Sequence, residues 1–316
     1  MTIFFIRRAN VLVQRAGTQS PISIFGGGDV TGIAPAGGIM VAGQFDGLHI
    51  KFKVEKNYIG QPNRMDLSIY NLSATTRRGL QGQGSFVRLL AGYQSDFPNL
   101  PIVFQGNARN IEHVREGSDW VTRIQCGDGE TAYRFGIANN TFPPGTTSSS
   151  IAIYLAQQFK QGDPLNIDIT AFVNKAPTIA YPYAAFSSGF SVQGNAFEEL
   201  SRLLGGKYTL SIQDGELRAL QASDYVPTGY RLSASTGLLG SPEHGTPNLA
   251  NLPTVLKLNC LLNPRIKPGD LVTVDSQNLH GNFRCHKVTH TGDLDGNDWK
   301  TEIDATPQAV GSPPSS

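Results

Sequence analysis

The chain has 316 residues, a formal net charge of +1 and 16% charged residues. A chain of this length can bury a substantial core and can hold two domains, or a duplicated pair with an insert. Because tight binding of DNA or RNA depends on many basic side chains that contact phosphates, the near-neutral charge argues against a nucleic-acid-binding protein.

The sequence predicts a protein that is made in the cytosol and has no stable membrane insertion. Arg7 and Arg8 interrupt the apolar N-terminus before a signal-peptide core can form, and no stretch approaches the roughly 20 apolar residues of a membrane span. The cysteines are three in number and widely spaced, which favours reduced thiols over disulfides: Cys126, Cys260 and Cys285.

Residues 1–46 are predicted to form one short strand followed by a Gly-rich arm. Three consecutive glycines at 26–28 and two more at 37–38 accompany Pro35, and the segment shows little hydrophobic periodicity. We expect this arm to be flexible or to be ordered by a partner.

Residues 47–132 are predicted to form a first β-barrel-like unit. Apolar and charged residues alternate without error over 50–55, so that Ile50, Phe52 and Val54 face a core and the charged residues between them face water. The alternation therefore predicts that this unit begins with a strand that is buried on one face.

Further elements of the first unit follow in order. Ser73 can cap a helical turn over 74–80 by accepting a backbone N–H. Strands are predicted at 86–93 and 102–109, and the unit closes near Asp128.

Residues 133–222 change period and are predicted to form a small α+β insert. Ser150 can cap a helix whose apolar residues recur at three- and four-residue steps, and a second helix starts at Asn195 and stops at the glycine pair 205–206. Asp214-Gly215 is a tight-turn dipeptide between two alternating runs, which indicates a hairpin.

Residues 223–306 are predicted to form a second β-barrel-like unit, and 307–316 a tail. The dipeptides Pro268-Gly269 and Asp295-Gly296 place turns between its strands. The final Gly-Ser-Pro-Pro-Ser-Ser has the composition of a disordered end.

The two tryptophans of the chain lie in matching local sequences, which favours the duplication of one structural unit. The first copy runs seven residues from His113 to Trp120, and the second runs nine residues from His290 to Trp299. We interpret eight residues as the structural repeat and expect both tryptophans to be buried: His113, Asp119, Trp120, Thr122, His290, Asp298, Trp299 and Thr301. Two copies of one unit suit an assembly protein better than a catalyst.

Neither of the two candidate metal sites in the sequence is supported. His286 and His290 lie beside Cys285, but four residues of strand span roughly 13 Å, so we favour histidines on a sheet face. The acidic segment 293–298 resembles a calcium loop in composition, but its glycine comes fourth where the EF-hand loop needs it sixth. We therefore predict a polar hairpin turn there.

Catalytic and cofactor patterns also fail, and no catalytic or cofactor-binding residue is predicted. The segment 205–207 lacks the Ser or Thr of a P-loop, and neither G-x-S-x-G nor H-E-x-x-H occurs. Asp119 and Asp298 are expected to satisfy backbone amides at strand starts. A carboxylate pair for glycoside cleavage stays open because its partners can be distant in sequence, although Glu198 and Glu199 are adjacent on a helix and diverge.

A series of short motifs occurs between about 47 and 306. The motifs are Asn71-Leu72-Ser73, Thr76-Arg77, Gly92-Tyr93, Phe104-Gln105-Gly106, the segment 262–269, His290-Thr291-Gly292-Asp293 and Asp298-Trp299. Together they resemble phage tail baseplate hub proteins.

The resemblance implies a homotrimer in which each subunit contributes two tube-like β-barrel domains. The six domains would form a pseudo-sixfold ring that joins a sixfold tail tube to a threefold central spike in the tail baseplate of the virion. The implied partners are the tail tube or distal tail protein, the central spike protein and the tape-measure protein, with DNA only in transit through the lumen. The insert is shorter than in larger hubs, and no appended lysozyme-like or peptidase domain is visible.

The sequence thus predicts a β-dominated α+β fold, with two related β-barrel tube domains and a small α+β insert between them. The leading functional hypothesis is a structural hub of a phage tail or a phage-derived injection device, not an enzyme. Two alternatives stay open: a wall-degrading hydrolase on a β scaffold, with scattered acids such as Asp119 and Glu198, and a tail-tip adhesin.

Overall fold

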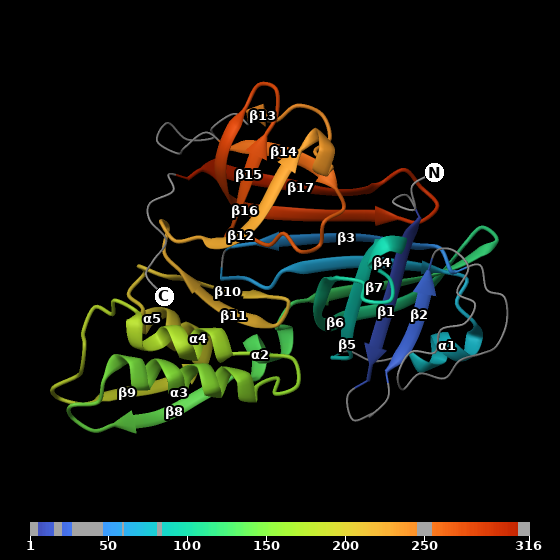
Figure 1. The fold of residues 1–316 in the computed structure, drawn as a ribbon. Coiled ribbons are helices and arrows are strands. Elements are labelled where there is room, and N and C mark those ends of the chain that lie inside the picture. Colours follow the sequence, from blue (N-terminus) through green and yellow to red (C-terminus); the bar gives the residue numbers. More distant parts are fainter. Residues whose placement is uncertain are drawn as a thin grey trace.

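The computed structural model describes residues 6–15, 21–26, 47–58, 60–80, 84–244 and 255–308 (Figure 1). Its strands are β1 (Arg7–Gln14), β2 (Ile22–Gly26), β3 (Ile50–Asn57), β4 (Arg64–Tyr70), β5 (Phe86–Tyr93), β6 (Ile102–Glu116), β7 (Asp119–Gly127), β8 (Ile137–Phe142), β9 (Phe190–Asn195), β10 (Thr209–Gln213), β11 (Glu216–Leu220), β12 (Val226–Ser233), β13 (Glu243–His244), β14 (Leu256–Leu261), β15 (Asp270–Asp275), β16 (His280–Asp293) and β17 (Trp299–Pro307). Its helices are α1 (Ala74–Gly79), α2 (Glu130–Phe135), α3 (Ser148–Gln161), α4 (Thr170–Lys175) and α5 (Ala196–Leu203), with short 3-10 turns η2 (Gln94–Asp96), η3 (Ala176–Thr178) and η4 (Ala234–Thr236). The expected β-dominated α+β class is confirmed.

Thirteen strands form one continuous sheet, and this sheet has two halves with the same strand order. The first half runs β5-β6-β7-β4-β3, and the second runs β15-β16-β17-β14-β13. Residues 287–293 of β16 pair antiparallel with residues 51–57 of β3 and join the halves. The two halves belong to a single sheet and stack one above the other in Figure 1. The segments for which barrel-like units were predicted, 47–132 and 223–306, supply most of their strands.

Alternating side chains explain why these strands form. In β3, Ile50, Phe52 and Val54 are buried while Lys51 and Lys53 are exposed, as the period of two predicts. The buried face of each half packs on an apolar core of its own. The first core also takes in Trp299 from the second half, so the two halves share apolar contacts as well as hydrogen bonds.

The N-terminal segment contains two strands where the sequence predicted one strand and then an arm. β1 pairs with β5 along all eight of its residues, and β2 pairs with β1. Val11, Val13 and Ile24 are buried, so both strands extend the first half of the sheet instead of leaving it. The predicted arm beyond residue 26 and the tail beyond residue 308 lie outside the described residues.

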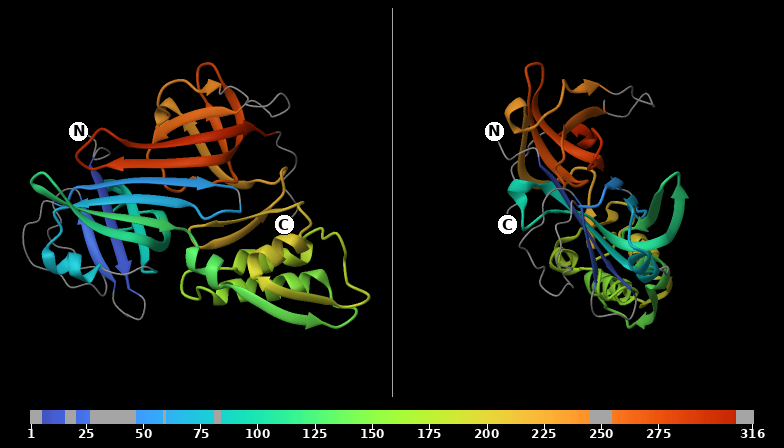
Figure 2. Two further views of the ribbon diagram at one scale, coloured as in Figure 1. Left: turned by 180° about the vertical axis from the view of Figure 1, so that it is seen from behind. Right: turned by 90° about the vertical axis from the view of Figure 1, so that its right-hand side faces the viewer.

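The insert has its own apolar core, drawn from residues between 132 and 219, and lies below the sheet in Figure 1. Figure 2 shows its helices α3, α4 and α5 gathered at one end of the molecule, beside the β8–β9 strand pair and the β10–β11 hairpin. The predicted hairpin at Asp214-Gly215 is confirmed, and both residues have a positive φ, 54° and 83°. The sequence did not predict α2, α4, β8 or β9.

One predicted helix cap is wrong and another is confirmed. The side chain of Thr147, not Ser150, caps α3 by accepting the backbone N–H of Ser150, so that the helix begins at Ser148. Asn195 caps α5 and accepts backbone N–H groups from Phe197 at 2.9 Å and Glu198 at 3.2 Å. Several hydroxyls in a row precede α3, and sequence alone does not say which one has the extended backbone of a cap. Among the described residues, none of the helices has the length and apolarity needed to cross a membrane.

The separate core of the insert yields a prediction about independent unfolding. Phe159 is fully buried, and its ring packs 5.4 Å from that of Tyr133 and 5.5 Å from that of Phe197. We expect Phe159→Ala to destabilise the insert by about 3–5 kcal/mol. Urea titration can separate the parts, because Trp120 and Trp299 both lie in the sheet and report only on it, while hydrogen exchange of residues 151–204 reports on the insert. If Phe159→Ala lowers the stability measured by tryptophan fluorescence as much as the stability measured by exchange in the insert, the sheet and the insert do not unfold independently.

Candidate functional site

The two predicted repeat segments form matching hairpins, β6–β7 and β16–β17. His113 lies opposite Thr122 in the first hairpin, and His113 Nδ1 lies 2.9 Å from Thr122 Oγ1. His290 lies opposite Thr301 in the second, with Nδ1 and Oγ1 3.0 Å apart. The same side-chain hydrogen bond therefore occurs at the same register in both halves of the sheet.

The backbone around each tryptophan is matched as well. The carbonyl of Trp120 accepts the N–H of Asn71, just after β4, at 2.7 Å, and the carbonyl of Trp299 accepts the N–H of Leu262, just after β14, at 3.2 Å. An arginine lies over each indole, Arg77 at 3.9 Å from the Trp120 ring and Arg7 at 5.6 Å from the Trp299 ring. Such cation–π contacts add a modest stabilisation at exposed sites and more where water is excluded.

The matching tryptophans differ in burial, so the expectation that both are buried is wrong for one of them. Trp299 is 4% exposed and packs edge-on against Phe52 of β3, with ring centroids 5.6 Å apart, whereas Trp120 is 39% exposed. The second hairpin is covered because it lies at the joint between the halves. The same burial lowers the pKa of His290 to about 3, and it lowers the pKa of the less buried His113 in the same direction.

The aspartates before the tryptophans do not satisfy backbone amides as expected. Asp119 accepts the side-chain amide of Asn71 at 3.0 Å, and the side-chain oxygen of Asn71 accepts the backbone N–H of Trp120. In the described part of the chain, the Asp298 carboxylate forms no hydrogen bond with a backbone amide. The sequence did not reveal that Asn71, and not Asp119, would accept the backbone N–H of Trp120 at the start of β7.

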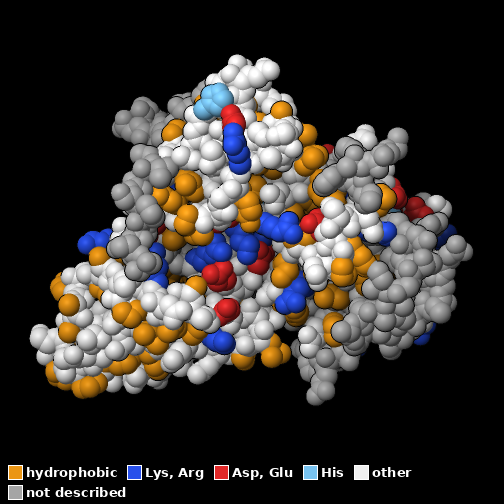
Figure 3. Space-filling view, in the orientation of Figure 1, with side chains coloured by type: hydrophobic (Ala, Val, Ile, Leu, Met, Phe, Trp, Pro, Cys, Tyr) orange, Lys and Arg blue, Asp and Glu red, His pale blue; other side chains and the backbone are white. Residues whose placement is uncertain are grey.

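A buried ion pair lies where the insert meets the two halves of the sheet. Lys56 of β3 is fully buried, and its Nζ lies 2.6 Å and 2.8 Å from the two carboxylate oxygens of Asp214, at the tip of the β10–β11 hairpin. Lys267, in the loop before β15, reaches the same carboxylate at 2.9 Å. Figure 3 shows basic and acidic side chains gathered on the face where these three parts of the molecule meet. We call Lys56, Asp128, Asp214 and Lys267 the charged junction.

Asp128 completes the charged junction from the end of β7. It is fully buried, and its oxygens accept the backbone N–H groups of Asp214 at 2.6 Å and Gly215 at 3.0 Å. Burial, followed by the negative charge of Asp214, raises the pKa of Asp128 to about 7. Burial also opposes ionisation of Asp214, but Lys56 and Lys267 outweigh it and lower the pKa of Asp214. The junction therefore fixes the insert hairpin in place.

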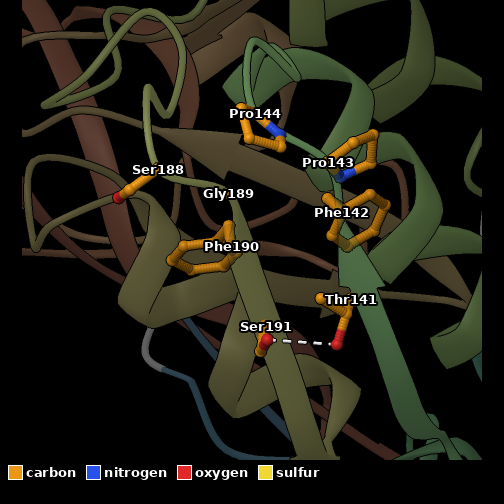
Figure 4. A pocket seen from close by; sticks show the side chains of 8 residues that line it. All are labelled: Thr141, Phe142, Pro143, Pro144, Ser188, Gly189, Phe190 and Ser191. Atoms are coloured by element: carbon orange, nitrogen blue, oxygen red, sulfur yellow. Dashed lines mark hydrogen bonds between the residues drawn. The ribbon is translucent and has the colours of Figure 1, made fainter.

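One shallow pocket lies on the insert, and its side chains offer no acid–base chemistry. It lies at one end of the β8–β9 strand pair and is lined by Thr141, Phe142, Pro143, Pro144, Ser188, Gly189, Phe190 and Ser191 (Figure 4). None of these side chains titrates near neutral pH, and the only hydrogen bond drawn among them joins the Thr141 and Ser191 hydroxyls at 3.1 Å. A wall-degrading reaction would need carboxyl groups there.

The metal candidates of the sequence are engaged in other contacts. His286 Nε2 lies 2.7 Å from the hydroxyl oxygen of Thr306, and Asp293 accepts the backbone N–H groups of Asp295 and Gly296 as a turn does. In the described ranges, no group of three or more His, Cys, Asp or Glu side chains is placed to hold a metal ion. Glu199 pairs with Arg202, and Glu198 is exposed on α5.

The charged junction went unnoticed in the sequence, although one signal for it was present. Lys56 continues the two-residue period of Ile50, Phe52 and Val54, so the strand itself turns this lysine toward the interior. A lysine at a core-facing strand position needs a buried partner. That partner lies 158 residues away in the chain.

No protein-family model matches the chain, and no curated protein matches it. Solved structures do match. A tail protein from Neisseria meningitidis MC58 is 10% identical with a TM-score of 0.56, and the 43 kDa tail protein of prophage MuSo2 from Shewanella oneidensis is 10% identical with a TM-score of 0.57. Each match covers 94% of this chain and 96% of the other.

A third structure comes from a secretion machine. The c3393 protein of E. coli, described as a component of the type VI secretion system with structural similarity to the T4 bacteriophage tail proteins gp27 and gp5, is 12% identical with a TM-score of 0.54. The match covers 96% of this chain and 79% of that one. At such low identity the comparisons establish a shared fold, and at that level the likeness to phage tail proteins indicated by the motifs is confirmed.

The unequal burial of the tryptophans predicts unequal effects of their removal. We expect Trp299→Ala to cost about 3–5 kcal/mol of unfolding free energy, because it empties a packed site. Trp120→Ala should cost about 1 kcal/mol or less, because that ring is open to solvent and stacks mainly on Arg77. Urea unfolding followed by circular dichroism measures both variants, and equal losses would show that the two sites are equally packed.

The charged junction predicts a large penalty for breaking its central pair. Asp214→Asn leaves Lys56 buried with no carboxylate partner, and we expect a loss of about 3–5 kcal/mol in unfolding free energy. The matched control is Asp66→Asn, which breaks the exposed pair with Arg64 and should cost about 1 kcal/mol or less. If the two variants unfold at the same urea midpoint, the junction is not a buried ion pair in solution.

Proposed function

We propose that this chain is a structural hub in the tail baseplate of a phage or of a phage-derived injection device. The observation that carries the proposal is the equal strand order of the two halves of the sheet, β5-β6-β7-β4-β3 and β15-β16-β17-β14-β13. The matching His–Thr hydrogen bonds in the two hairpins support the duplication. The fold shared with tail proteins supports the setting.

The duplication gives the hub a physical purpose. A closed ring of three copies contains six similar half-sheets, so one assembly can present six similar surfaces to a sixfold tube and three identical ones to a threefold spike. We propose a homotrimer of this kind. The predicted division into a first unit at 47–132, an insert at 133–222 and a second unit at 223–306 belongs to the same proposal.

The proposed partners follow from this position. The ring would bind the tail tube or a distal tail protein on one side and the central spike protein on the other, while the tape-measure protein and then DNA pass through its lumen. The net charge of +1 suits a channel that DNA crosses without being held. The eight repeat residues would then have structural roles, and we propose no catalytic activity for the chain.

The proposal predicts self-assembly of the purified chain. Mass photometry over a range of concentrations should reveal a species three times the 34.0 kDa of one chain, and negative-stain images of that species should show rings. A protein that stays monomeric at every concentration would contradict the hub. A clearing band in a cell-wall zymogram would instead favour the hydrolase.

A further inference from the structure

The β16 edge that pairs with β3 has an equivalent in β6, and within the described ranges that equivalent edge carries no strand. In the second half, residues 287–293 of β16 pair with β17 on one edge and with β3 on the other edge. β17 is the equivalent of β7 in the first half. In the first half, residues 107–116 of β6 bind β7 on one edge, while β5 covers only residues 102–107 of the other. Among the described residues, no strand pairs with the outer edge of 109–116.

Burial shows the same difference, residue by residue. Val288 and His290 are fully buried and Thr289 is 8% exposed. Their counterparts are less covered: Ile111 and His113 are half-buried and Glu112 is exposed. Trp120, at the same place as the buried Trp299, is 39% exposed. Figure 2 shows the β6–β7 hairpin, in green, projecting from the body of the molecule. This edge thus has the same construction as the β16–β3 joint, but none of the strands that the structure describes pairs with it.

A strand with a matching edge lies at the far end of the second half, where β14 is its one partner among the described strands. β13 occupies the place in the second half that β3 occupies in the first, beside β14 as β3 lies beside β4. The registers align the two strands: Lys53 pairs with Asp66 of β4, and Glu243 pairs with Lys257 of β14 at the equivalent position. Of the strands that the structure describes, β13 is the last in the order on this side, and Glu243 is exposed.

We infer that the outer edge of β6, at residues 109–116, binds β13 of a second copy of this chain in antiparallel register. The contact copies the β16–β3 joint that exists within each chain, and the inference rests on the hub function proposed above. His290 pairs with Val54 and Thr291 with Lys53 in the internal joint, so Val114 lies opposite Glu243 of the second copy. Main-chain hydrogen bonds along an open sheet edge supply the affinity.

Trp120 anchors this contact. Trp299 is covered from across the internal joint by Phe52, and the position of Phe52 corresponds to Pro242 beside β13. Large aromatic side chains that become buried at the centre of an interface are frequent hot spots of binding. Because each copy offers one β6 edge and one β13, the contact is head-to-tail and closes only as a ring.

Cysteine cross-linking tests the register. Directly opposed residues of an antiparallel pair lie close enough for a disulfide, and the native cysteines Cys126, Cys260 and Cys285 are buried. The double variant Val114→Cys/Glu243→Cys should give a ladder that stops at three chains on a non-reducing gel. Each single variant should stay uncrosslinked, as should the control Gln157→Cys/Glu243→Cys, whose first cysteine lies on α3 of the insert.

A second variant separates binding from folding. Trp120→Ala should weaken self-association at least tenfold in mass photometry while its urea unfolding stays close to wild type. Rings that form without the 114–243 cross-link, or that form equally well with Trp120→Ala, overturn this interface and leave the hub function standing. A chain that never self-associates overturns both.

Discussion

The hydrogen bonds between residues 287–293 of β16 and residues 51–57 of β3 set the architecture of the whole molecule. They place the second half of the sheet on the first, bury His290 and bring Trp299 against Phe52. They also fix the position of β3, and with it the position of Lys56, which contacts Asp214 of the insert. A register slip of one residue would turn every side chain of β3 to the opposite face.

Buried polar contacts hold the insert hairpin against this sheet. The insert buries its apolar side chains in its own core, and its hairpin tip meets the sheet through Asp214, Lys56 and Asp128. Buried charges are expensive to desolvate, so such a contact tolerates few alternative geometries. A rigid, directional docking of this kind fits a protein whose parts must keep fixed positions within an assembly.

The fold class, the insert and the repeated hairpins were predictable from the sequence because they depend on local period and turn chemistry. Strand alternation, the Ser73 cap and the Asp214-Gly215 turn are all short-range signals. The exposure of Trp120 and the charged junction were not predictable, since each depends on which distant strand covers a residue. The similar local sequences do not indicate that Trp299 has Phe52 across a joint while Trp120 has no such neighbour among the described residues.

The long separation in sequence between β3 and β16 has a consequence for biosynthesis. About 220 residues lie between β3 and β16, so β3 leaves the ribosome long before this partner, and one of its edges stays unpaired in the meantime. Open edges invite aggregation, and lysine is a residue that natural proteins place on them. β3 carries two such lysines, Lys51 and Lys53, whose side chains are exposed in the folded chain.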